Sequence, residues 1–173
     1  MRLTELSPIE LDIIRRVSGL PIDRSAMTVM SNVWRTARGF ELRMERRVLR
    51  PNGLTFAAFN TLFIVWIWAP VETRQIARLS GVTRATVTST VTKLERQGLV
   101  TRHGSEGDGR LVLVKLTRKG KGMIERIFPE FNKDEQSIAS SLTVKEQDTL
   151  TSLLRKVQRA VGGDSAAEWP DIA

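Results

Sequence analysis

The stretch TRQIARLSGVTRATVTSTVTKLERQGLVTR, residues 73–102, decides the fold of this chain. Its first part has the pattern of a short helix, and a turn at residues 80–82 separates it from a second helical pattern. The second pattern contains five threonines, at positions 83, 86, 88, 90 and 92. Each threonine inside a helix costs up to about 0.7 kcal/mol relative to alanine, because its branched β-carbon restricts the side chain. We therefore expect either strong tertiary support for this helix or a partner that uses its hydroxyl and methyl groups.

The sequence pattern changes from helix to strand after Gly98. Residues 99–103 (LVTRH) and 110–116 (RLVLVKL) are rich in branched and apolar side chains, and the intervening GSEGDG supplies three glycines. This pattern predicts a β-hairpin with a glycine-rich tip. A short helix, a turn, a second helix and a basic hairpin follow one another in the order of a winged helix-turn-helix.

Other helices are expected on both sides of this motif. Ser7, Pro8 and Glu10 form a helix-start signature, and residues 27–48 show a long amphipathic pattern that ends before Pro51 and Gly53. The apolar segment 54–70 reads as a central buried helix, with Thr55 as its N-cap and Pro70 beyond its end. Residues 71–79 read as the short helix before the turn.

Two further helices are expected after the hairpin. Thr117 is the expected cap of the first, and Pro129 is expected to kink or break it. Thr143 and Glu146 predict a capping box in front of a last amphipathic helix.

The positive charge is concentrated in the expected winged segment. The chain has a formal charge of +8 and a pI near 10.7. Residues 82–121 contain nine Lys or Arg and three acids (+6), whereas residues 122–173 contain six and nine (−3). A local excess of this kind favours a polyanionic partner.

Residue counts exclude several kinds of chemistry. The sequence has no cysteine and one histidine, so disulfides, thiolate sites and a histidine-based zinc site are excluded. We find no Ser-His-Asp set, paired-carboxylate motif or phosphate-binding glycine loop. No signal segment or 20-residue apolar span is present. We therefore expect a cytoplasmic protein that is not an enzyme and has no metal site or cofactor.

The threonine-rich helix has two distinct faces. Val87, Val91 and Leu94 are spaced to face inward, which leaves an outer face of small, hydroxylated and basic residues: Arg84, Ala85, Thr88, Ser89, Thr92 and Arg96. Such a face can lie close to base edges in a major groove. The alternative is a solvated helix that contacts nothing. Four further residues are candidate phosphate contacts, or plain solvated polar residues: Arg102, His103, Lys115 and Lys119.

Residues 27–160 resemble the MarR family of bacterial transcription regulators. The likeness rests on LTFAAFNTL, on the helix-turn-helix segment and on the hairpin DGRLVLVKLTRKG, with Asp108 and Arg110 in its wing. The resemblance implies a mostly α fold with a small β-hairpin, and a homodimer on a pseudo-palindromic operator. The implied organisation is an N-terminal extension with a short helix (1–26), helical dimerisation regions (27–50 and 118–160), a winged helix-turn-helix DNA-binding domain (54–117) and a flexible tail (161–173).

Several DNA contacts follow from the resemblance residue by residue. It implies that Arg84, Ala85, Thr88 and Ser89 face the major groove and that Arg110 enters the flanking minor groove. Asp108 is expected to orient Arg110, or else to be a solvated turn carboxylate. Many relatives have arginine at the position of Ser89. We therefore expect fewer charged base contacts here and more dependence on hydroxyls, water and DNA shape.

The resemblance also implies a small-molecule pocket between the dimerisation helices and the winged domain. Trp34 and Arg38 lie one helical turn apart, and the expected buried helix contributes aromatic and amide groups that could complete a pocket: Phe59, Asn60, Phe63 and Trp66. The alternative is that these aromatic residues are ordinary core. Some urate-responsive relatives carry an acid near the position of Asn60, so urate is not assumed.

These observations predict a sequence-specific regulator that binds double-stranded DNA. Repression released by a small aromatic or anionic ligand is the expected mode. The alternative is a winged-helix module for RNA or protein contact without a ligand response. The sequence does not identify the operator, the regulated genes or the effector.

Overall fold

The computed structural model describes residues 7–105 and 108–162, without the side chains of residues 105 and 108–111. The chain divides into two compact units, residues 1–43 and residues 44–173. Each unit is described by itself. The predicted tail from residue 163 onward and the hairpin tip at residues 106–107 lie outside the described residues.

The N-terminal unit contains α1 (Pro8–Arg16) and most of α2 (Arg24–Met44). The predicted capping box is confirmed, because Ser7 and Glu10 bond each other's backbone N–H groups. Glu10 also joins the two helices. Its Oε1 accepts a hydrogen bond from Asn32 Nδ2 at 2.8 Å and pairs with Arg35 Nη2 at 3.2 Å. The short leading helix is therefore anchored to α2 through polar contacts.

The second unit opens with a change of helix type. The chain continues from α2 into a π-helical turn, η2 (Glu45–Leu49), and a 3-10 turn, η3 (Arg50–Asn52). Gly53 follows with φ of 72°, a left-handed conformation that glycine adopts at little cost. The predicted end of the amphipathic helix at Pro51 and Gly53 is confirmed.

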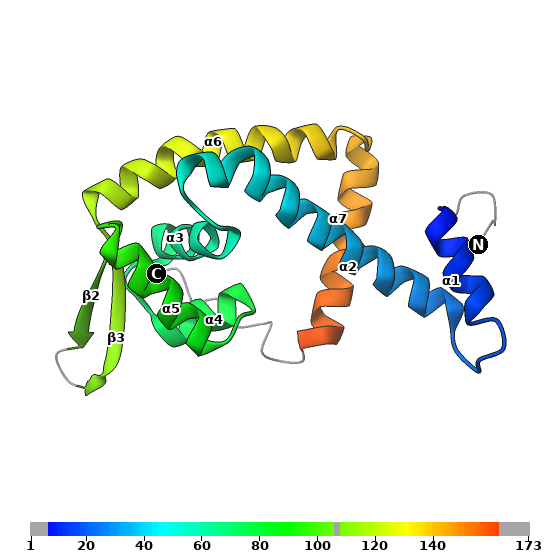
Figure 1. Ribbon diagram of the computed structural model, residues 1–173, viewed down its shortest axis with the longest axis horizontal. Helices are drawn as coiled ribbons and strands as arrows, with labels where there is room; N and C mark the ends of the chain where they lie inside the picture. The colour runs from blue at the N-terminus through cyan, green and yellow to red at the C-terminus, as the bar shows by residue number, and fades with distance from the viewer. Residues whose placement is uncertain (1–6, 106–107, 163–173) are drawn as a thin grey trace. The chain divides into compact units, whose positions relative to one another are not determined.

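Helix α3 (Phe56–Trp68) is the centre of the second unit, as predicted. Its N-cap is Thr55, whose hydroxyl accepts from the Ala58 N–H at 3.2 Å. Five of its residues are buried: Phe59, Thr61, Leu62, Ile64 and Val65. It packs against α4 (Thr73–Ser80), α5 (Arg84–Arg96), α6 (Arg118–Ala139) and strand β3 (Asp108–Leu116) (Figure 1).

A three-stranded antiparallel sheet completes the winged motif. Strand β3 lies between β1 (Val71–Glu72) and β2 (Val100–Ser105). Val71 pairs with Val114, which also faces the core, and both are buried. The prediction that residues 71–72 begin the short helix was wrong. They form β1 because pairing with β3 satisfies their backbone groups, and α4 starts after them with Glu72 as N-cap.

The hairpin connects to α6 through a close backbone approach. Thr117 caps α6 as predicted, and its hydroxyl also donates to the Gly98 carbonyl at 2.7 Å. Gly120 is buried, and a Cβ atom there would lie 1.9 Å from the Leu99 carbonyl oxygen. The hairpin base and the first turn of α6 therefore fit together only with glycine at this position.

Helix α6 continues through Pro129 to Ala139. Of the predicted kink or break at Pro129, the break was wrong, because side chains on both sides of the proline pack against α3. The kink stays a prediction. Phe128 stacks on Phe63 at 5.4 Å, and Phe131 stacks on Phe59 at 4.4 Å. Asp134 is buried and pairs with Arg47 Nε at 3.2 Å, which ties α6 to η2.

The last helix is α7 (Val144–Gly162). The predicted capping box at its start is confirmed, since Thr143 and Glu146 bond each other's N–H groups. It extends two residues into the segment that was predicted as a flexible tail. The predicted fold class, mostly α with a small β-hairpin in a winged helix-turn-helix, is confirmed.

Candidate nucleic-acid interface

Helix α5 is held firmly by its inner face. Thr83 caps its start by accepting from the Thr86 N–H at 3.2 Å. Gly81 makes the preceding turn with φ of 67°, so the angle between α4 and α5 depends on a glycine. As predicted, Val87, Val91 and Leu94 are buried. The opposite face is therefore presented by a rigid element.

The outer face of α5 is open and carries mostly small side chains. Arg84, Ala85, Thr88 and Ser89 are exposed, and Thr92 is half-buried. The structure thus places all five predicted contact residues of α5 away from the core. Small side chains allow the helix backbone to approach a groove closely.

The threonine hydroxyls bond first to their own helix. Thr88 Oγ1 donates to the Arg84 carbonyl at 2.9 Å, and Thr90 Oγ1 donates to the Thr86 carbonyl at 2.8 Å. A hydroxyl that has donated its proton still has lone pairs. Thr88 can therefore accept a hydrogen bond from a base amino group without losing the bond inside the helix.

An ion pair joins the hairpin to α5. Arg102 of β2 donates through Nε to Glu95 Oε2 at 2.9 Å, and its Nη1 lies 3.5 Å from Thr92 Oγ1. The hydrogen bonds from Arg102 hold the pKa of Glu95 below its ordinary 4.5. Arg102, which the sequence suggested as a phosphate contact, is thus bound to α5. The sequence pattern did not single out Glu95, because its partner Arg102 comes from a different element.

The wing residues Asp108 and Arg110 lie on the backbone of β3, next to the hairpin tip. Their side chains lie outside the described residues, so their predicted pairing and the minor-groove contact of Arg110 stay predictions. The backbone pairing is irregular between Gly104 and Ser105, just before the tip.

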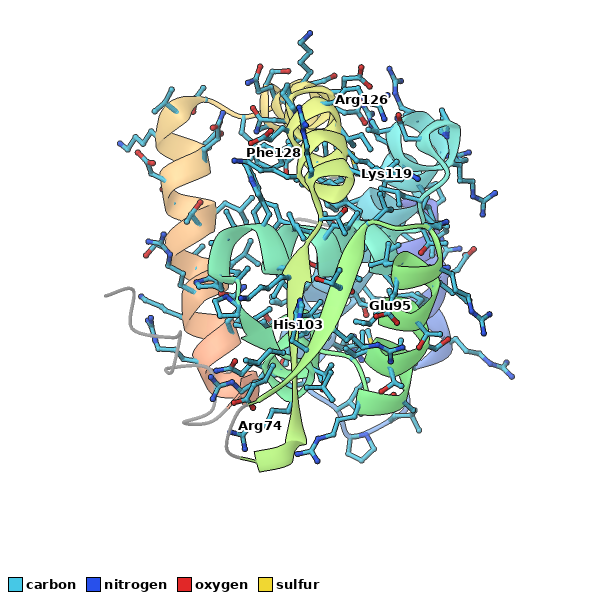
Figure 2. All side chains as sticks on the ribbon, turned by 90° about the vertical axis from the view of Figure 1, so that its left-hand side faces the viewer. Arg74, Glu95, His103, Lys119, Arg126 and Phe128 are labelled. Carbon is cyan, nitrogen blue, oxygen red and sulfur yellow. The ribbon has the colours of Figure 1, made fainter. Side chains whose placement is uncertain are left out.

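Three Lys or Arg side chains of the second unit that Figure 2 labels lie at two opposite ends of it. Arg74 lies at the end where β2 ends and β3 begins, whereas Lys119 and Arg126 lie at the other end (Figure 2). Lys119 Nζ donates to the Gln97 carbonyl at 2.8 Å and so caps the end of α5. Lys119 therefore has a structural role at the end of α5. The sequence had suggested only a phosphate contact for this residue.

The same fold and motif occur in proteins of known class. The MarR family model matches residues 54–112. The uncharacterized HTH-type transcriptional regulator YwaE of Bacillus subtilis (strain 168) is 35% identical over 156 residues, which cover 88% of this chain and 91% of that protein. The chain belongs to the MarR family of transcriptional regulators.

Two other MarR-type comparisons cover most of the chain. HTH-type transcriptional regulator PecS of Dickeya dadantii (strain 3937) is 30% identical over 146 residues, which cover 84% of this chain and 78% of that protein. A mutant MarR from E. coli, with a crystal structure in complex with operator DNA, is 26% identical in sequence to this chain. It has a TM-score of 0.70 and covers 77% of this chain and 95% of that one.

The residues expected to line a MarR-type ligand pocket fall in both units. Trp34 is 69% exposed in the N-terminal unit, where Arg38 pairs with Glu41 at 2.8 Å. Phe59, Phe63 and Trp66 belong to an aromatic cluster of the second unit, and Asn60 is half-buried. Phe59 is a core residue, as the alternative interpretation expected. The pocket itself stays a prediction.

The described part of the chain contains neither a metal-binding cluster nor a membrane-spanning helix. Among residues 7–105 and 108–162, no group of three or more His, Asp or Glu side chains could hold a metal ion. None of the helices within these residues is long and apolar enough to cross a membrane.

Proposed function

We propose that this MarR-family regulator reads a specific double-stranded DNA sequence with the outer face of α5 and represses transcription from that site. The observation that carries this proposal is the combination of a rigid inner face and an exposed, small and polar outer face on α5. The residues proposed to contact the major groove are Arg84, Ala85, Thr88, Ser89 and Thr92. A regulator with this role works in the cytoplasm, where the chromosome lies.

The wing is proposed to contact DNA beside the major groove. Arg110 on β3 is the proposed minor-groove residue, and Asp108 is proposed to orient it. Arg102 contributes to DNA binding mainly because its ion pair with Glu95 fixes the hairpin to α5. A phosphate bond of its own is not part of the proposal.

The regulator is proposed to act as a homodimer. Helix α7 carries apolar residues that stay exposed in the single chain: Val144 is 75% exposed, Leu153 52% and Val161 75%. Within the described residues, none of the side chains of α7 is buried. A second copy packed on such a helix would bury these residues, and two winged motifs related by a twofold axis fit a pseudo-palindromic operator.

Release by a small aromatic or anionic ligand is the proposed mode of control. It is supported by family membership and by the chemistry of the candidate residues, since a guanidinium such as that of Arg38 can bond a carboxylate and an amide such as that of Asn60 can bond a carbonyl. The genes that the protein controls would suggest which ligands to test.

The experiment that tests this function is a selection from genomic DNA. Purified protein is mixed with sheared DNA of its own source at about 150 mM salt, where nonspecific binding is weak, and bound fragments are sequenced. Enrichment of a near-palindrome with half-sites about 10 base pairs apart supports the proposal. Random enrichment contradicts sequence-specific reading and favours a winged-helix module for RNA or protein contact.

A further inference from the structure

An open groove runs between α4 and the start of α5, on the flank of the recognition helix. Its volume is about 600 Å³. Three arginines contribute to its walls, and the remaining lining is small or neutral: Arg74, Arg78 and Arg84, with Gln75, Ala77, Val82 and Thr83. No acidic side chain of the described chain lines it. The groove is therefore positively charged, although Arg74 is also paired with Glu72 beside it.

The spacing of these arginines suits a chain of separate negative charges. Arg74 and Arg78 are four residues apart on α4, so their side chains emerge from the same face about one helical turn apart. Both are exposed. Arg84 stands in the first turn of α5, where unpaired backbone N–H groups and the helix dipole also favour an anion.

Arg74 is held in place by its neighbour Glu72. Its Nη2 donates to Glu72 Oε1 at 3.3 Å, and its Nε lies against Oε2. Glu72 is itself fixed as the N-cap of α4, where its N–H donates to Gln75 Oε1 at 3.1 Å. Because 62% of the Arg74 side chain stays exposed, a preorganised guanidinium remains accessible to a ligand.

The groove also lies on the correct side of the winged motif. Arg74 is found at the end of the second unit where β2 ends and β3 begins, and the basic residues of α6 that Figure 2 labels lie at the opposite end. The first helix of a helix-turn-helix crosses the DNA backbone when the second lies in the major groove. The ligand that fits this position is a phosphate of the DNA backbone.

We propose that Arg74 and Arg78 form an arginine clamp that binds neighbouring phosphates of the strand bordering the major groove, beside Arg84, which the proposed function assigns to the groove itself. This inference rests on the proposed DNA-binding function. The clamp contributes affinity without sequence preference, because phosphates are the same in every duplex. It also sets the depth and register at which the small side chains of α5 meet the bases.

The test measures how DNA affinity depends on salt. Wild type and the single variants Arg74→Gln and Arg78→Gln are titrated, between 50 and 200 mM KCl, with two labelled 30-base-pair duplexes. One carries the sequence enriched in the genomic selection and the other a shuffled version of it. Each lost phosphate contact should reduce the slope of log affinity against log salt by about 0.9. The affinity gap between wild type and variant should accordingly shrink about threefold over this range.

Arg126→Gln is the matched control, because it removes the same charge from the opposite end of the unit. It should leave the slope unchanged, and Arg74→Lys should retain most of the wild-type slope. Thermal melts of all variants verify that they fold.

The outcomes separate the clamp from the proposed function. Equal losses on both duplexes for Arg74→Gln and Arg78→Gln, with none for Arg126→Gln, support the clamp. Slopes equal to that of the control overturn it. If wild type fails to distinguish the two duplexes, sequence-specific reading fails while the clamp is still measured on both. If wild type binds neither duplex, both proposals fall.

Discussion

Thr88 and Thr90 are matched residues with different expected roles. Each donates its hydroxyl to the carbonyl four residues earlier in α5, but Thr88 lies on the proposed DNA face and Thr90 does not. Alanine at either position should raise the free energy of unfolding by up to about 0.7 kcal/mol, because alanine favours the helix. Only Thr88→Ala should reduce discrimination between the selected and shuffled duplexes, by about fivefold for one lost bond of about 1 kcal/mol. Equal discrimination by the two variants in parallel titrations would show that Thr88 makes no base contact.

Gly120 and Gly122 form a second matched pair, both in the first turns of α6. A Cβ at Gly120 would meet the Leu99 carbonyl at 1.9 Å, whereas nothing lies within 4 Å of a Cβ at Gly122. Gly120→Ala should therefore lower the free energy of unfolding by about 1 to 3 kcal/mol. Gly122→Ala should raise it by up to about 1 kcal/mol. Denaturant titration of both variants measures this, and a stabilising Gly120→Ala would mean that the hairpin base and α6 are not in close contact.

At the scale of elements, the contact between Glu95 and Arg102 joins α5 to β2. Glu95→Gln or Arg102→Gln should each lower the free energy of unfolding only slightly, since both side chains are partly exposed and solvent screens the pair. The double variant should add little to either single change. If Arg102 acts through Glu95, Arg102→Gln should leave the salt slope of DNA binding unchanged. A slope lower by about 0.9 in this variant would instead indicate that Arg102 contacts a phosphate directly, as the sequence suggested.

The link between α1 and α2 is expected to depend on pH. The Ser7 backbone N–H, followed by the Asn32 and Ser7 side chains and the charge of Arg35, lowers the pKa of Glu10 from 4.5 to about 2. A carboxylate whose pKa is depressed by folding stabilises the structure above its ordinary pKa. That stabilisation is lost as the pH falls from about 4.5 toward 2.

Hydrogen exchange of the α1 amides, corrected for intrinsic rates, follows this change directly. Protection in wild type should fall as the pH is lowered through this window. Glu10→Gln should show weaker protection at neutral pH and little further change in acid. A wild-type profile that is flat down to pH 2 would show that Glu10 does not anchor α1.

At the scale of the whole molecule, the sequence predicts the motif order well because its signals are local. The caps at Ser7, Thr55, Thr117 and Thr143 each satisfy N–H groups only three residues away, so a single sequence reveals them. The inner face of α5 follows from helical periodicity in the same way. These short-range patterns are enough to define a winged helix-turn-helix.

The features that were missed depend on partners distant in sequence. Strand β1 has two residues and exists only because β3 pairs with it. Pro129 stays inside α6 because aromatic residues of α3 hold the helix on both sides of it. The clamp residues Arg74 and Arg78 did carry a local signal, their four-residue spacing on the helix before the turn. Their relation to Arg84 required the angle that Gly81 sets between α4 and α5.

The central claim is that the outer face of α5 lies against DNA, and Ala85→Glu tests it most directly. Ala85 is exposed in the first turn of α5, where an acidic residue should maintain or raise stability by about 0.3 to 1 kcal/mol. The measurement is the affinity of this variant for the selected duplex, together with its thermal melt. The account predicts a folded protein that no longer binds, because a longer and negatively charged side chain keeps the helix out of the groove. A folded variant that binds as tightly as wild type would contradict it.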